Sequence, residues 1–201
     1  AGTFERGSTR APDESPVRSI QLDAFAIDRT EVSLADFEQF ARRGWADDKL
    51  WSADGIAWRN AHPGGSGREL RAADRHETHP VVGVSWYEAQ AYCRWAGGTL
   101  PSEAQWERAA CGGRQQTYPW GDHHPEGIRW STKNSPFAVM RVDTAPVSTD
   151  TAPGPEGLLH MAGNVWEWTS NWYYPEHDPA DSLNPTGPSQ QESVNRNHGN
   201  A

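Results

Sequence analysis

The segment "GLLHMAGNVWEWTSNWY", residues 157–173, is the part of the sequence that decides the fold. Trp166 and Trp168 flank a single residue, a spacing typical of an extended segment with both indoles on one face. Buried indoles remove a large apolar area from water, and each N–H then needs a partner. We therefore predict that Trp166 and Trp168 are core residues. Asn164 is predicted to tie loops together through its amide, which offers two donors and an acceptor.

The composition limits the classes of protein to which the chain can belong. Hydrophobic residues make up only 35% of the 201 residues, yet 11 are Trp, so a few large aromatic side chains must form much of the core. The net charge of −9 argues against nucleic acid and against an anionic membrane surface as partners. No apolar run approaches the roughly 18 residues of a membrane span, so we expect a soluble protein. The compartment stays open, with an extracytoplasmic or cell-surface location among the alternatives.

Three helices are predicted from capping signals, in which a Ser and a polar residue three positions later satisfy free N–H groups. They begin after Ser33, Ser85 and Ser102, and they are predicted to end at Gly44, Gly97 and Gly112. Each run carries apolar residues at helical spacing, which gives the helix one face for the core. The chain should therefore contain several short amphipathic helices.

Short strands and long loops are predicted between the helices. Residues 18–28 alternate between apolar and polar side chains, which indicates a strand, and residues 79–86 and 158–168 are predicted as further short extended segments. Residues 44–78, 112–156 and 174–201 show no periodicity and are predicted as loops. Loops of this length in a compact domain usually carry function or are disordered.

The order of these segments resembles the formylglycine-generating enzyme family, also called sulfatase-modifying factors. The similarity rests on "AGTFERGS", "IQLDAFAIDRTEVSLADFEQF", "HPVVGVSWYEAQAYCRWAGGTLPSEAQWERAA", "YPWGD", "GLLHMAGNVWEWTSNWY" and "NPTGP", in this order, over about residues 1–188. The resemblance implies an α+β chain with the C-type-lectin-like fold of this family. It has a few short helices, a small distorted antiparallel sheet and much irregular structure. Residues 1–201 would form one such domain, with the family's last segment missing or altered after about residue 188.

The resemblance also implies a copper centre, which this sequence does not reproduce. In the name-giving enzymes two C-terminal cysteines bind copper(I), and oxygen is used to convert a sulfatase cysteine to formylglycine. Here no cysteine follows Cys111, and copper(I) prefers soft sulfur ligands. Cys93 lies on the apolar stripe of the predicted second helix, where we expect a structural role. We therefore expect copper only if a C-terminal cysteine pair exists outside these residues.

Calcium is the second metal that the resemblance implies, since the family holds it with side-chain and carbonyl oxygens, the hard ligands that this ion requires. One site would use the carbonyls of Gly163 and Val165 and the carboxylate of Glu167. His160 stands where the family usually has Asn or Asp, and Glu167 accepting hydrogen bonds from loop N–H groups is the alternative. A second site would use Asn134, the carbonyl of Ser135, and Asp143.

These observations leave three functions open. The first is a module that binds a protein or small-molecule ligand through its loops, without a copper thiolate pair of its own. Its ligand surface would include the aromatic residues Trp51, Trp58, Trp120, Tyr173 and Tyr174. The second is a copper-dependent oxidase whose catalytic C-terminal segment is absent from these residues. The third is an accessory domain of a larger enzyme, such as a sulfoxide synthase or a kinase fusion.

Overall fold

The computed structural model describes residues 1–65, 76–122, 144–149, 153–173 and 181–190. Two strands and four α-helices occur in this part of the chain, which makes the fold α+β. The elements are β1 (Gly2–Arg6), β2 (Arg18–Leu22), α1 (Leu34–Arg43), α2 (Ala53–Ala61), α3 (Trp86–Trp95) and α4 (Glu103–Cys111), with 3₁₀ turns at Pro12–Glu14 and Asp48–Leu50. None of the described helices is long and apolar enough to cross a bilayer.

The helix predictions from capping signals are confirmed. The Oγ atoms of Ser33, Ser85 and Ser102 each accept a hydrogen bond from the backbone N–H three residues later, at the starts of α1, α3 and α4. At α3 and α4 the side chain of the third residue also accepts from the Ser N–H, which completes the reciprocal cap. α4 ends at Gly112, whose φ of 62° is left-handed and therefore suits glycine.

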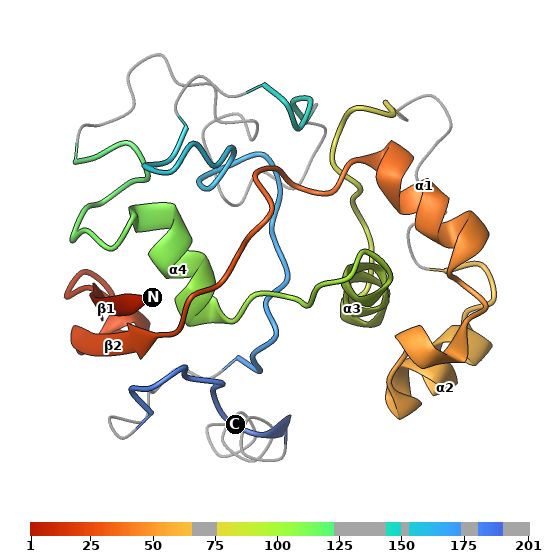
Figure 1. Ribbon diagram of the computed structural model, residues 1–201, viewed down its shortest axis with the longest axis horizontal. Coiled ribbons are helices and arrows are strands. Elements are labelled where there is room, and N and C mark those ends of the chain that lie inside the picture. Colours follow the sequence, from red (N-terminus) through yellow and green to blue (C-terminus); the bar gives the residue numbers. More distant parts are fainter. Residues whose placement is uncertain (66–75, 123–143, 150–152, 174–180, 191–201) are drawn as a thin grey trace.

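β1 and β2 form an antiparallel hairpin that packs on α4, on the left of Figure 1. Phe4 and Ile20 face each other across the hairpin and are buried with Ala104 of α4. The guanidinium of Arg6, only 5% exposed, forms ion pairs with Glu103 at 2.7 Å and Glu107 at 3.3 Å. Because these carboxylates lie on successive turns of α4, the ion pairs fix the helix against the end of β1.

A second core is almost entirely aromatic and joins α1, α2 and α3. Phe40 of α1 is completely buried at its centre. Its ring lies 5.5–6.2 Å from five other aromatic rings, those of Phe37, Trp45, Trp51, Tyr92 and Trp95. Rings at these separations gain attraction beyond their buried area. This cluster explains how a chain poor in aliphatic residues still builds a core.

Two irregular segments cross the middle of the molecule, between α4 and the helices α1 and α3 (Figure 1). Residues 23–33 lead from β2 to α1, and residues 153–173 run beside them. The Leu159 N–H donates to the Arg29 carbonyl at 2.9 Å, and Val81 donates to Val32 at 2.9 Å. The centre is therefore built from loop backbone, held by single hydrogen bonds.

Several predictions about strands and loops were wrong. The strand predicted for residues 18–28 ends at Leu22, and residues 79–86 contribute one isolated bridge, between Ser33 and Pro80. Residues 158–168 form no strand, because His160 and Asn164 have φ of 58° and 59°, which an extended strand cannot contain. The predicted loop at 44–78 contains α2, whose cap at Ser52 lacks the acidic or amide partner three residues later.

Candidate ligand cavity

A cavity of about 480 Å³ lies beside the central loops. Its walls come from residues 25–32, from the segment entering α3, from α3 itself, from the start of α4, and from residues 159–168. Five aromatic residues line it: Phe25, Tyr92, Trp106, Trp166 and Trp168. Its volume lies in the range of small-molecule and cofactor sites in proteins.

Trp166 and Trp168 open onto this cavity and are not core residues. Trp166 is 86% exposed and Trp168 is 49% exposed, so the prediction that both are buried was wrong. Alternation along the chain indicated that the two indoles share a face, but it carries no information on whether anything covers that face. The Trp168 Nε1 donates to the Val84 carbonyl at 3.0 Å, which fixes one edge of its ring.

Glu167 lies between these two tryptophans in the sequence and lines the same cavity. Its carboxylate accepts a hydrogen bond from the Trp106 Nε1 of α4. The residue keeps exposed surface as a whole, yet desolvation of the carboxyl group raises the pKa of Glu167. The Trp106 hydrogen bond and the nearby His160 oppose that rise without cancelling it. A raised carboxyl pKa means that the charged form is costly at this position.

Asn164 joins three loops in the way the sequence suggested. Its side chain is 6% exposed, and its Oδ1 accepts from the Ala145 N–H at 2.8 Å. Its Nδ2 donates to a Glu31 carboxylate oxygen at 2.6 Å and to the Ala145 carbonyl at 3.2 Å. The left-handed backbone at Asn164, which Asn tolerates better than most residues, aims the amide inward. Residues 31, 145 and 164 therefore share one buried hydrogen-bond centre.

The two cysteines lie on different helices and are poor nucleophiles. Cys93 of α3 lines the cavity, and burial, reinforced by Asp28, raises its pKa to about 11. Burial and then Glu107 raise the pKa of Cys111. Both thiols are free and half-buried. Because the thiolate is the form that attacks and binds metals, this part of the chain offers no copper(I) pair.

The calcium positions are only partly within the described residues. Gly163, Val165 and Glu167 lie on the central segment, where Val165 and Glu167 line the cavity. The Trp106 N–H on Glu167 agrees with the alternative in which this carboxylate accepts loop hydrogen bonds. Asn134, Ser135 and Asp143 lie outside the described residues. No group of three His, Cys, Asp or Glu side chains suited to a metal occurs within the described ranges.

The aromatic residues proposed for a ligand surface separate into different environments. Trp51 is 5% exposed and belongs to the aromatic core, so its assignment to a ligand surface was wrong. Trp58 packs against the same core, and Trp120 stacks on Tyr118 at 5.2 Å. Tyr173 is 64% exposed, whereas Tyr174 lies outside the described residues. None of the four described residues lines the cavity, which the sequence analysis did not locate.

Comparison with known proteins identifies the class of this domain. The sequence profile of the family described as "Sulfatase-modifying factor enzyme 1-like domain" matches residues 1–200. The chain belongs to this family, in agreement with the resemblance of its motifs. The match covers the hairpin, all four helices and the central segment.

Individual relatives carry different names. The chain is 36% identical to a formylglycine-generating enzyme of Mycobacterium tuberculosis, over 88% of this chain and 73% of that protein. It is 33% identical to the formylglycine-generating enzyme of Mus musculus, over 94% of this chain and 61% of that protein. It is also 36% identical to the serine/threonine-protein kinase pkn1 of Chlamydia caviae, over 94% of this chain but 30% of that protein.

Proposed function

We propose that this chain is a binding domain of the formylglycine-generating enzyme family, which takes a protein or small-molecule ligand in the cavity beside Trp166 and Trp168. The observation that carries the proposal is the exposure of two large indoles at the wall of a 480 Å³ cavity. Exposed aromatic rings in a concave site supply much apolar contact to a ligand at little entropic cost. The ligand surface is then built from irregular loops, as the C-type-lectin-like architecture implied by the resemblance would have it.

The alternative is that the domain is itself a copper-dependent oxidase, but the residues present do not fit a copper centre. Cys93 and Cys111 are the two cysteines of the sequence, and the pKa of each is raised. A copper-dependent oxidase would therefore need a cysteine pair outside these residues. Equal identity of 36% to a formylglycine-generating enzyme and to a protein kinase supports a shared fold over a shared reaction.

The kinase relative favours a second candidate, an accessory domain within a larger protein. This domain accounts for less than a third of that kinase. Such a role is compatible with binding at the same cavity, since an accessory domain commonly presents a ligand or partner to its neighbour.

The test is a titration observed through the indole N–H resonances of labelled protein. A synthetic peptide spanning the modified cysteine of a sulfatase, and a library of small fragments, are titrated separately. A ligand in the cavity should shift the resonances of Trp166 and Trp168 and leave that of Trp172 in place. Trp166→Ala should weaken binding at least about tenfold, while Trp172→Ala, which removes an indole outside the cavity, should not.

Two outcomes would count against the proposal. Peptide and fragments that leave the cavity resonances unshifted would mean that this surface binds neither class of ligand. Conversion of the peptide cysteine to formylglycine after addition of copper(I) in the presence of oxygen would favour the oxidase over the binding module.

A further inference from the structure

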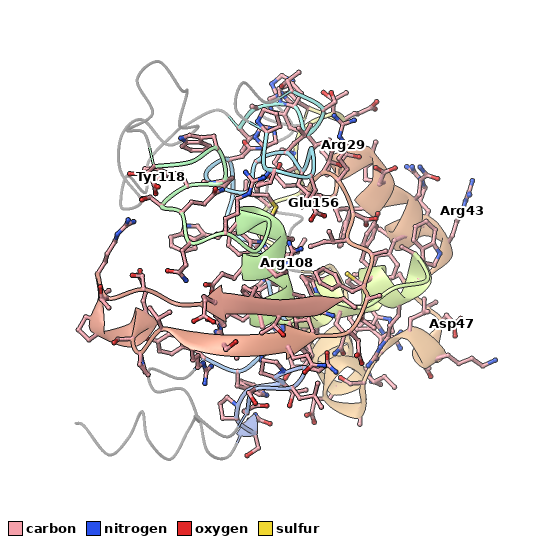
Figure 2. All side chains as sticks on the ribbon, turned by 60° about the vertical axis from the view of Figure 1, so that its left-hand side comes forward. Arg29, Arg43, Asp47, Arg108, Tyr118 and Glu156 are labelled. Carbon is pink, nitrogen blue, oxygen red and sulfur yellow. The ribbon has the colours of Figure 1, made fainter. Side chains whose placement is uncertain are left out.

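Among the residues that the structure describes, the charged ones that line the cavity are mostly acidic. Asp28, Glu31 and Glu167 contribute three carboxyl groups there, against the one guanidinium of Arg29. The Nε of Arg29 donates to the Gly157 carbonyl at 2.9 Å, one residue after Glu156 (both side chains are labelled in Figure 2). One of its five N–H donors is therefore engaged, and the three carboxyl groups outnumber this guanidinium at the cavity wall.

The pKa values of Tyr92 and Cys93 indicate a negative electrostatic potential near Asp28. Burial, followed by Asp36 and Asp28, raises the pKa of Tyr92 to about 12. Burial and then Asp28 raise the pKa of Cys93 to about 11. Burial alone opposes any charge, but the acidic neighbours oppose only a further negative one. A positively charged group would instead be attracted by the Asp28 carboxylate.

The aromatic residues of the cavity wall can replace part of the hydration that a cation loses when it leaves water. Trp is the side chain whose ring face attracts cations most strongly. Trp166 and Trp168 expose 86% and 49% of their surface, and the Nε1 atom of Trp168 is held by the Val84 carbonyl. Weakly hydrated cations gain most from such faces, since they lose little hydration on entering.

We propose that this cavity selects a weakly hydrated organic cation, an alkylated ammonium or a guanidinium, held against Trp166 and Trp168 with Asp28 as its counter-charge. The inference rests on the proposed function, because it uses the same cavity and adds the charge of the ligand. Glu31 contributes less to the recognition, since its carboxylate already accepts from Asn164.

The experiment compares choline with 3,3-dimethylbutan-1-ol, a neutral molecule of the same shape, by titration calorimetry and indole resonances. Butylguanidinium and butyrate form the second pair of probes. Choline or butylguanidinium should bind at least about fivefold more tightly than the neutral alcohol, a ratio within the range of cation–π attraction. Butyrate should not bind. Added salt should weaken cation binding, because Asp28 is exposed.

Matched variants separate the contribution of the Asp28 charge to binding from that of the Trp166 ring. Asp28→Asn keeps shape and should reduce the preference for choline over the alcohol, while Trp166→Ala should reduce binding of both cations. Trp172→Ala is the control, and unchanged melting temperatures show that each variant is folded. Equal binding of choline and its neutral isostere, or preference for butyrate, would overturn the inference. If the sulfatase peptide or a neutral fragment still binds in the cavity, the proposed function survives that result; if nothing binds, both fail.

Discussion

Replacement of Trp166 by Ala should scarcely change stability, although the sequence alone predicts a severe loss. A buried Trp removes up to about 250 Å² from water. With 86% of Trp166 exposed, about one seventh of that area contacts protein. At about 25 cal/mol per Å², the side chain contributes at most about 0.9 kcal/mol. A core Trp or Phe would cost about 3–5 kcal/mol when cut to Ala.

Phe40→Ala provides the contrasting variant, because Phe40 is fully buried among five aromatic rings. For a chain of this size, each kcal/mol moves the melting temperature by about 2–4 °C. Trp166→Ala should therefore lower it by at most about 4 °C, and Phe40→Ala by about 6–20 °C. Both are measured by thermal and urea unfolding under one set of conditions. A loss above about 3 kcal/mol for Trp166→Ala would refute the exposed position of this indole.

Four further predictions concern the central loops and the thiols. Asn164→Ala should cost about 2–4 kcal/mol in urea unfolding, because it removes the hydrogen bonds of this amide to the Glu31 carboxylate and to Ala145. A loss under about 0.5 kcal/mol would contradict the shared hydrogen-bond centre. Cys93 should react with iodoacetamide at pH 8 about 20-fold more slowly than free cysteine, since its pKa of about 11 reduces the thiolate fraction more than it raises nucleophilicity, and Cys111 should also be slow; rapid alkylation monitored by mass would disprove this. Because the folded pKa of Glu167 is raised, its contribution to stability is greatest below the unfolded pKa of about 4.3 and is lost as pH rises through the folded pKa; Glu167→Gln should remove that part of the pH dependence, and parallel curves for the two proteins would count against it. If calcium binds at Glu167, a chelator should lower the melting temperature of the wild type and not that of Glu167→Gln. An unchanged melting temperature of the wild type would mean that calcium does not stabilise this protein.

The helices were predictable because their signals are local. A Ser followed three residues later by Glu88 or Gln105 specifies a helix start from four residues alone, and α3 and α4 begin as predicted. α2 lacks that signal, since Gly55 stands at the third position after Ser52. The role of Asn164 was also accessible, because an amide with two donors and an acceptor suits a junction between loops.

The candidate site was less predictable because it depends on contacts between distant segments. Burial of Trp166 depends on which distant segments contact it, and periodicity within one segment does not identify those segments. The positive φ at His160 arises from loop packing, with its Nε2 3.3 Å from the Pro146 carbonyl. The cavity itself is formed by segments far apart in the sequence, so its carboxylates and indoles could not be grouped from spacing.

The edge of β2 carries a consequence for how the domain assembles. Asp23 donates its N–H to Asn184 Oδ1 at 2.8 Å, across 161 residues of chain, and Leu183 bridges Gln21 beside it. At translation rates of about 5–20 residues per second, roughly 10–30 s separate synthesis of these two partners. During that interval the outer edge of the hairpin stays open to mispairing with other strands. Helices α1, α3 and α4 can form early from local contacts, whereas closure of this edge must come late and slow the overall rate.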